Sequence, residues 1–452
     1  RHVAAAAAHS EEEQEIVSKQ RRLPDVLLLR LLLLTVVFLP EDQQQRQRQK
    51  QRWRWLVSGC CDTMPGGALI RMSVEEGKAF LHEGDQALDE ADRAASRPPN
   101  KRRQRLRSRL VWLASLVAVW ILLVYALFPT VFYTSSWVRR TILFEAYRSR
   151  SANLDRPELF GLNCTRNFYI DSEPGVRVGA WYTPSAAADL AGLSCGPQQQ
   201  RPMFAGDDRV VLLLHGITAN RGTPHRTHLV RRLAHEVPAH VVTIDYRGFG
   251  DSSAETPSLP GETHDALAAF ELIRAGGVPS DRIVLWGHSM GTAVAMQVAA
   301  ELHRRNETPS AMVLEAAFDN VGNVTRHSKI SRIWRWMPWF DAVFSHPLMR
   351  DPATAADNVL QARLIGPSMP VLMLHAEDDR TTPFEVAGVL QRKIRHDRRN
   401  TGRAGPVKSV LFGKEHHLGH NWLARYRGLP DIVRQFLDKH TVGDGRLDQI
   451  VL

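Results

Sequence analysis

The chain has 452 residues, of which 44% are hydrophobic, and its formal net charge is +10. This composition supports a large buried core and excludes a wholly disordered protein. Four cysteines are too few for a disulfide-stapled scaffold, and the basic excess is concentrated just before an apolar run, so we expect a membrane anchor and no nucleic-acid partner.

Residues 1–109 are predicted to form a disordered, basic, cytoplasmic region. An alanine run and a Gln/Arg-rich tract are typical of low-complexity sequence. The apolar stretch 26–39 contains Arg30 and is short for a membrane span, so its contact with a membrane is left open. The chain begins with Arg1, and Met64 and Met72 are alternative starts.

Residues 110–133 are predicted to form a transmembrane helix. No charged residue occurs from Leu110 to Val138, and the first part of this run is long enough to cross the hydrocarbon core of a bilayer. Six basic residues precede the run and two follow it, which favours a cytoplasmic N-terminus and a lumenal or extracellular C-terminal part.

Residues 155–440 are predicted to form an α/β domain with a doubly wound, mostly parallel sheet. The expected strands are continuous apolar runs, which is typical of strands covered on both faces. Helical patterns at 263–274 and 292–304 predict right-handed crossovers. The predicted strands are 210–214, 240–244, 282–286, 311–314, 371–374 and 409–412.

The sequence Gly287-His288-Ser289-Met290-Gly291 lies between a predicted strand and a predicted helix. A serine on so sharp a turn exposes its hydroxyl at the sheet edge, where it can attack a carbonyl carbon. Gly287 and Gly291 allow the strand and the helix to pass close together. We therefore predict that Ser289 is a catalytic nucleophile.

A serine nucleophile needs a base, and the base needs an acid that orients it. In this type of fold the acid follows the serine in the chain. The strand at 371–374 is followed by Glu377, Asp378 and Asp379, and we choose Asp379 as the acid. The alternative is that Asp379 only caps the next helix.

The base is expected in the loop after the last predicted strand. His416, His417 and His420 all lie there, and His420 is the preferred base because it follows Gly419 and leads into the final helix. His416 and His417 remain alternatives. No carboxylate or cysteine pattern accompanies the histidines, so we expect no metal and no cofactor.

Backbone amides are expected to form an oxyanion hole. One donor is the N–H of Met290, at the start of the helix after the nucleophile. The second is the N–H of Ile217, in the loop after the strand at 210–214, where Gly216 permits a close approach.

An aromatic-rich segment between the fourth and fifth predicted parallel strands is expected to form a lid around residues 325–350. Three tryptophans occur between positions 334 and 339. Beside a membrane anchor, they suit a lid that meets acyl chains at the bilayer surface. The alternative is that they form part of the core.

Two cysteines and three glycosylation sequons follow the predicted span. Cys164 and Cys195 could pair in an oxidising compartment, and free thiols are the alternative. The candidate glycosylation sites are Asn163, Asn306 and Asn323.

Together these segments resemble the α/β-hydrolase domain-containing serine hydrolases. The resemblance runs from about Leu110 to Leu437 and depends on 214–216, 240–252, 286–292, 374–379 and His420. It implies an α/β-hydrolase fold with Ser289, Asp379 and His420 as nucleophile, acid and base. It also implies a single-pass protein of the endoplasmic reticulum with a lumenal catalytic domain.

We therefore expect a membrane-anchored serine hydrolase that cleaves the acyl ester of a single-chain lipid through an acyl-enzyme. The expected substrates are lysophosphatidylserine or another lysophospholipid, and monoacylglycerol, so the expected partners are a lipid and a membrane. The alternatives are a protein depalmitoylase and a non-catalytic binding protein with a hydrolase fold.

Overall fold

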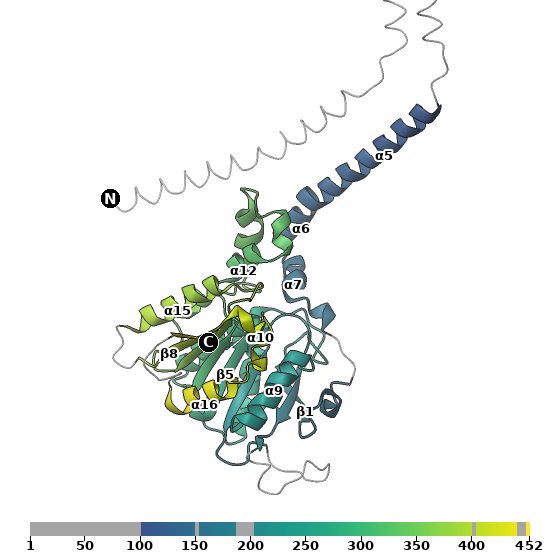
Figure 1. Cartoon of the computed structure of the whole chain (residues 1–452). Coiled ribbons are helices and arrows are strands. Elements are labelled where there is room, and N and C mark those ends of the chain that lie inside the picture. Colours follow the sequence, from purple (N-terminus) through teal and green to yellow (C-terminus); the bar gives the residue numbers. More distant parts are fainter. Residues whose placement is uncertain (1–100, 150–152, 187–202, 400–403, 441–448) are drawn as a thin grey trace, which may run out of the picture. The chain divides into compact units, whose positions relative to one another are not determined.

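The computed structural model describes residues 101–149, 153–186, 203–399, 404–440 and 449–452 (Figure 1). The chain divides into two compact units, Arg1–Lys101 and Arg102–Leu452, and the fold described here is that of the second unit. The apolar stretch 26–39 and Cys195, both considered above, lie outside the described residues.

A long helix begins the described part of the chain. Helix α5 (Lys101–Leu122) continues through the π-helical turn η2 (Leu123–Leu127) into α6 (Phe128–Thr134). The stretch Gln104–Thr134 is long and apolar enough to cross a membrane, and its most apolar window is not buried by the protein. The predicted disorder up to residue 109 is wrong for the last nine positions, because Lys, Arg, Gln and Leu all favour a helix and extend α5 back to Lys101.

The helix ends at Ser135, which leaves the helical conformation. The Ser135 side chain then accepts a hydrogen bond from the backbone N–H of Val138 and caps α7 (Ser136–Phe144). Arg139 of α7 donates to the carbonyl oxygens of Phe132 and Tyr133 at the end of α6, and so stabilises the bend between the two helices.

A nine-stranded sheet forms the centre of the domain, in the order β1-β2-β4-β3-β5-β6-β7-β8-β9. The six predicted strands are all present, and they pair in parallel. They are β3 (Arg209–Leu214), β4 (Ala239–Asp245), β5 (Ile283–His288), β6 (Ala311–Glu315), β7 (Val371–Ala376) and β8 (Val407–Phe412).

The sheet has additions at both edges. Strands β1 (Arg166–Glu173) and β2 (Val176–Thr183) form an antiparallel hairpin, and β2 pairs with β4. Strand β9 (Gln449–Val451) pairs in parallel with β8. The predicted domain end at residue 440 is therefore wrong, because three residues of strand are too short to give a recognisable pattern.

Helices cover both faces of the sheet, so successive residues of each strand enter two different cores. In β3, Val210, Leu212 and Leu214 face one core, and Val211 and Leu213 face the other. The first core includes buried residues of α10 (Leu259–Ala275), α11 (Met290–Arg304) and α15 (Phe384–Arg398). The second includes those of α9 (Pro224–Glu236) and α16 (Leu429–Lys439).

The chain between β6 and β7 leaves the sheet and returns to it, and we call residues 316–370 the β6–β7 insertion. Figure 1 shows its helices beside α6. Its elements are α12 (Val321–His327), η6 (Ile330–Ile333), η7 (Asp341–Ser345), α13 (His346–Arg350) and α14 (Asn358–Gln361).

Candidate active site

Ser289 stands on a sharp turn between β5 and α11. Its backbone has φ 54° and ψ −120°, which is a strained conformation for a residue with a side chain. A Cβ on Gly287 would collide with the backbone of Gly291, and one on Gly291 would collide with that of Leu214. The two glycines therefore make this turn sterically feasible.

His420 lies in the loop after β8, and its Nε2 is 2.9 Å from Ser289 Oγ. On the other side of the ring, Nδ1 is 2.8 Å from Asp379 Oδ2. This geometry lets the imidazole accept the serine proton while the carboxylate holds the ring in place. The three residues predicted from the sequence thus lie in one hydrogen-bonded chain.

The Asp379 carboxylate is held by the loop that follows β7. Its Oδ1 accepts hydrogen bonds from the backbone N–H groups of Thr381 and Thr382, and its Oδ2 accepts one from Thr382 Oγ1. Burial raises the pKa of Asp379, but the hydrogen bond and charge of His420 outweigh burial and lower it to about 2. Asp379 is therefore ionised at neutral pH. It bonds the amides ahead of Phe384, as the alternative interpretation expected, but α15 has no side-chain cap.

The other carboxylates and histidines considered for these roles lie elsewhere. Asp378 accepts the backbone N–H of Gly419, so it fixes the loop that carries His420. Glu377 accepts the N–H of Lys414. His416 and His417 are exposed, and the ring of His416 lies against Tyr426. Of the three candidate bases, the structure brings only His420 into hydrogen-bonding distance of Ser289.

The predicted oxyanion loop lies directly beside the nucleophile. A Cβ on Gly216 would be 2.9 Å from Ser289 Cβ, so only glycine fits there without a shift. Arg226 of α9 donates to the carbonyl oxygens of Gly216 and Thr218 and fixes the loop around Ile217. The donor roles of the Ile217 and Met290 amides remain predictions.

Comparison with known proteins shows the family to which the chain belongs. The profile of the family described as alpha/beta hydrolase fold matches residues 209–346. Lysophosphatidylserine lipase ABHD12 of Danio rerio is 30% identical over 358 residues, which are 79% of this chain and 91% of the relative. The chain belongs to the ABHD12 family of α/β hydrolases.

Other members of the family have similar identity over the C-terminal part. Lysophosphatidylserine lipase ABHD12 of Xenopus tropicalis is 35% identical over 63% of this chain and 72% of its own length. Protein ABHD12B of Homo sapiens is 35% identical over 64% of this chain and 76% of its own length.

The loop after β3, which is the predicted oxyanion loop, is supported by a buried ion-pair network that the sequence did not predict. Arg221 is fully buried and pairs with Asp245, at the end of β4, and with Asp251, in the glycine turn that follows. Its backbone N–H also donates to Asp245 Oδ1. The only sequence signal was the pair of carboxylates near that turn, which could equally have been exposed caps.

A buried carboxyl, Glu315, lies close enough to His420 to feel its charge. Its backbone oxygen accepts the N–H of Ser289, and its Oε2 accepts Trp286 Nε1 at 2.9 Å. Burial raises the pKa of Glu315 to about 7, although the Trp286 hydrogen bond and the charge of His420 lower it. Nothing in the sequence distinguished this glutamate from an ordinary strand-end residue.

The ring of His288, which precedes the nucleophile, supports the His420 loop. Its Nε2 is 3.0 Å from the backbone oxygen of His420, and the two ring centroids are 5.1 Å apart. Burial lowers the pKa of His288 well below its usual value, so its imidazole is neutral. A neutral ring here adds no positive charge beside the base.

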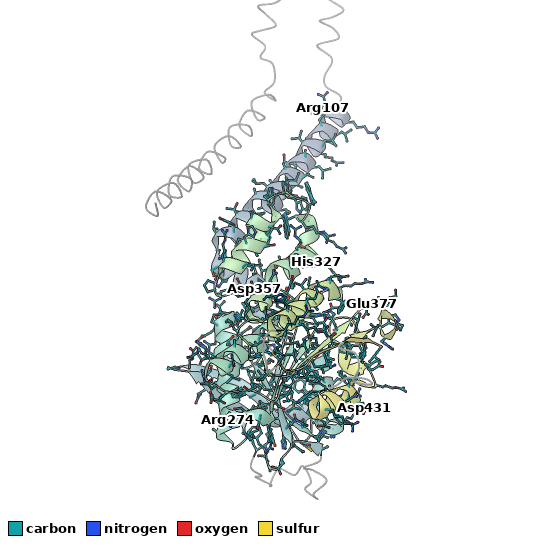
Figure 2. All side chains as sticks on the ribbon, turned by 90° about the vertical axis from the view of Figure 1, so that its left-hand side faces the viewer. Arg107, Arg274, His327, Asp357, Glu377 and Asp431 are labelled. Atoms are coloured by element: carbon teal, nitrogen blue, oxygen red, sulfur yellow. The ribbon has the colours of Figure 1, made fainter. Side chains whose placement is uncertain are left out.

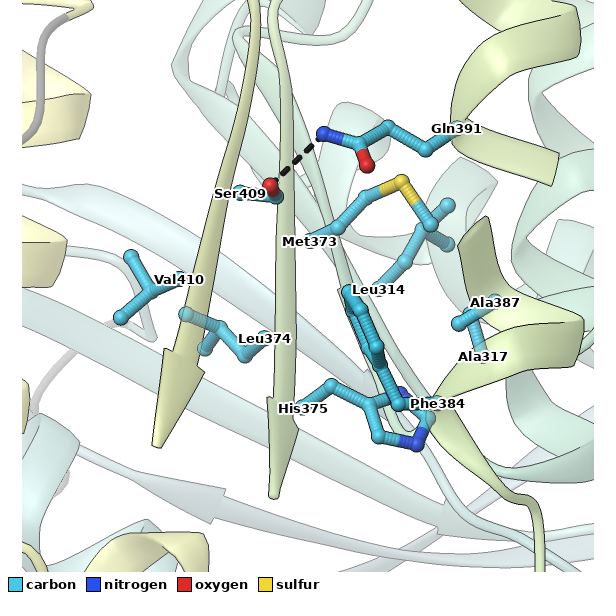
Figure 3. Close-up of a pocket in the computed structure, with 10 residues that line it drawn as sticks. All are labelled: Leu314, Ala317, Met373, Leu374, His375, Phe384, Ala387, Gln391, Ser409 and Val410. Atoms are coloured by element: carbon cyan, nitrogen blue, oxygen red, sulfur yellow. Dashed lines mark hydrogen bonds between the residues drawn. The ribbon is translucent and has the colours of Figure 1, made fainter. Parts of the chain in front are cut away.

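A small cavity lies between α15 and the sheet, and Figure 3 shows the His375 and Phe384 rings at one end of it. His375 Nε2 is 2.7 Å from the backbone oxygen of Thr382, so His375 helps to hold the loop that carries Asp379. Neither Ser289 nor His420 lines this cavity.

Among the described residues, no group of three or more His, Cys, Asp or Glu side chains is placed to hold a metal ion. That the reaction needs neither a metal nor a cofactor remains a prediction.

The predicted modification sites differ in their surroundings. Asn163 and Asn306 are exposed. Asn323 is half-buried at the start of α12, and its side-chain amide donates to Asp319 Oδ2 at 2.5 Å. Cys164 is disulfide-bonded.

Proposed function

We propose that the chain is a membrane-anchored serine hydrolase that cleaves the acyl ester of single-chain lipids, lysophosphatidylserine first among them. As a member of the ABHD12 family it is a lipid ester hydrolase, and the relatives are named as lysophosphatidylserine lipases. The observation that carries the proposal is the hydrogen-bonded chain from Ser289 through His420 to Asp379.

The proposed reaction has two halves. Ser289 Oγ attacks the ester carbonyl carbon while His420 Nε2 takes the serine proton, and the Met290 and Ile217 amides stabilise the oxyanion. The intermediate then collapses, and His420 gives its proton to the leaving alcohol of the glycerol part. In the second half, His420 takes a proton from water as the water oxygen attacks the acyl carbonyl carbon. The bond from that carbon to Ser289 Oγ then breaks, His420 returns the proton to Ser289 Oγ, and the fatty acid leaves.

We propose that the continuous helix from α5 through η2 into α6 crosses the membrane once, with its N-terminal end in the cytoplasm and the catalytic domain in the lumen of the endoplasmic reticulum. The six basic residues before the apolar run support this orientation. The disulfide at Cys164 also supports it, because disulfides persist in oxidising compartments.

We further propose that residues 325–350, within the β6–β7 insertion, act as a lid. Ser289 is only 7% exposed, so a lipid reaches it when some covering segment moves. The insertion contacts the helix that follows the nucleophile, since the Asn358 side-chain amide lies 3.4 Å from Thr292 Oγ1 of α11.

The test is the release of fatty acid by the purified full-length chain and by its Ser289→Ala variant. The substrates are lysophosphatidylserine, lysophosphatidylcholine, monoacylglycerol and a palmitoyl thioester peptide. Hydrolysis of the lysolipids by the wild type and not by Ser289→Ala is the expected result. Hydrolysis of the thioester alone would indicate a depalmitoylase, and no hydrolysis of any substrate would indicate a binding protein.

A further inference from the structure

The part of the long helix that stands clear of the domain is too short to cross a bilayer. Every residue from Leu110, the first after the last charge, to Leu123 is exposed (Figure 2 shows the free side chains around Arg107). These fourteen residues rise about 21 Å along the helix axis, and any tilt reduces the depth that they span. A hydrocarbon core is about 30 Å thick, so it must also surround helix residues that follow Leu123.

The β6–β7 insertion covers the next turns of the same helix. Trp334 Nε1 donates to the backbone oxygen of Val124, within the π-helical turn η2. The Trp334 ring stacks on Phe128, with centroids 5.1 Å apart, and Phe344 packs against Phe132 at the same distance. Ser136 and Arg139 also bond to Asp351, just after α13, which joins the insertion to α7.

These two observations fix the depth of Trp334 relative to the bilayer. The helix needs about six residues beyond Leu123 to complete the hydrocarbon thickness, and that stretch is the one that Trp334 contacts. The segment on either side of Trp334 therefore lies at membrane depth, in the leaflet on the C-terminal side of the span.

The outer face of that segment has the composition of a membrane-interface surface. Ile330 is 63% exposed, Ile333 41% and Trp336 70%. Lys329, Arg332 and Arg335 alternate with them and are exposed, and no carboxylate occurs from Val321 to Phe340. Apolar side chains of this kind enter a bilayer, and basic side chains beside them reach up to anionic head groups.

We infer that residues 329–336, which we call the insertion tip, dock into the bilayer beside the transmembrane helix, with their basic side chains on anionic lipid head groups. The inference rests on the proposed function, because it takes α5 to cross a membrane. The tip and the span act as one unit, so the β6–β7 insertion is held at the depth where a single-chain lipid lies.

The test measures the depth of single labelled sites. The parent is the full-length chain with Cys60→Ser and Cys61→Ser, and its own labelling gives the background. Single cysteines replace Ile333 and Trp336 in the insertion tip, and each carries an environment-sensitive fluorophore. The proteins are reconstituted into vesicles of phosphatidylcholine and phosphatidylserine, with or without a doxyl quencher on the acyl chain.

Two control sites separate the possible failures. Ser115→Cys lies on the exposed part of α5, and Asp431→Cys lies on α16, far from Arg107 in Figure 2. Doxyl quenching at positions 333 and 336 is expected to be within about twofold of that at 115 and several-fold above that at 431. If position 115 is quenched and 333 and 336 resemble 431, the docking inference is overturned while the anchor stands. If 115 also resembles 431, the proposed anchor fails, and the inference fails with it.

The basic side chains have their own control. Replacing phosphatidylserine with phosphatidylcholine is expected to reduce the quenching at position 333 in the parent. The combined Lys329→Gln, Arg332→Gln and Arg335→Gln change should remove that dependence on anionic lipid. Equal dependence in both proteins would overturn the role of the three basic residues.

Discussion

Ser289, His420 and Asp379 follow three different strands, and hydrogen bonds join them into the chain that the proposed reaction uses. The position of each depends on a neighbour with no chemical role. Thr382 holds Asp379, Asp378 holds the backbone before His420, and Glu315 holds the backbone of Ser289. The geometry of the site therefore depends on more residues than the reaction itself uses.

Replacing the base tests the assignment among the three histidines. His420→Ala is expected to lower kcat for lysophosphatidylserine by at least about 10³-fold, because removing one member disables the whole unit. The matched controls are His416→Ala and His417→Ala, whose side chains are exposed and should leave kcat within about twofold of wild type. A severe loss in either control, with His420→Ala active, would overturn the assignment of the base.

The buried carboxyl of Glu315 predicts a pH dependence of stability. Its pKa is raised from 4.5 to about 7. Between these two pH values Glu315 is protonated in the folded chain and ionised in the unfolded chain. The free energy of unfolding should therefore fall as the pH rises from 4.5 through 7, by about 3 kcal/mol in total from this group. Glu315→Gln keeps an acceptor for Trp286 and should remove this part of the dependence.

Thermal unfolding of both proteins at several pH values between 5 and 8 measures the effect. The Tm of the wild type should fall relative to that of Glu315→Gln as the pH rises toward 8. A difference that stays constant across the range would show that Glu315 does not titrate there.

At the residue scale, the sequence predicted the candidate triad, but it did not predict the buried residues that hold the triad and its neighbouring loop in place. Ser289 was recognisable because the Gly-x-Ser-x-Gly turn has a local steric requirement. Arg221 and Glu315 were not, because their importance comes from burial against residues distant in the chain. A charged residue in a sequence pattern carries no sign of such burial.

At the element scale, the loop between β3 and α9 lies beside Ser289 and is the proposed source of the second oxyanion donor. Thr218 and Ala219 both have positive φ, at 64° and 60°, and Arg226 binds the carbonyl oxygens of the loop. The loop approaches Ser289 through Gly216. A side chain at that position would push the two elements apart.

Gly216→Ala is therefore expected to lower kcat by about 10²-fold with a small change in KM, because a displaced oxyanion donor weakens transition-state binding. Steady-state kinetics on monoacylglycerol measures the split. The control is Gly388→Ala in α15, where the new methyl group would meet only the end of the Arg392 side chain. Unchanged kcat in Gly216→Ala would contradict the placement of the oxyanion loop.

The parallel strands were predictable because their apolar runs are continuous and β3, for example, is buried on both faces. The edges were not. In β1, buried and exposed side chains do not alternate regularly, so its sequence has no clear strand pattern. Strand β9 has only three residues. The start of α5 was also missed, because charged helix formers look the same in a disordered tail and in an exposed helix.

At the scale of the whole molecule, the proposed topology puts the catalytic domain and its β6–β7 insertion on the lumenal side of a membrane. The sequence supports this orientation through the charges at the two ends of the apolar run. Glycosylation reports on it directly, since Asn163 and Asn306 are exposed and the side-chain amide of Asn323 is already bonded to Asp319.

Protein made in cells should therefore shift in mobility after peptide-N-glycosidase treatment. The double change Asn163→Gln and Asn306→Gln should abolish the shift, and Asn323→Gln should leave it unchanged. Protease treatment of sealed microsomes gives an independent reading of the topology. An unglycosylated domain that is digested in sealed microsomes would contradict the lumenal orientation.

The most direct test of the central claim is the site of labelling by a long-chain fluorophosphonate on the full-length protein, mapped by peptide mass spectrometry. We expect a single phosphonylated serine, Ser289, and protection of that site by lysophosphatidylserine. Labelling of a different serine, or labelling of Ser289 that lysophosphatidylserine does not slow, would contradict it.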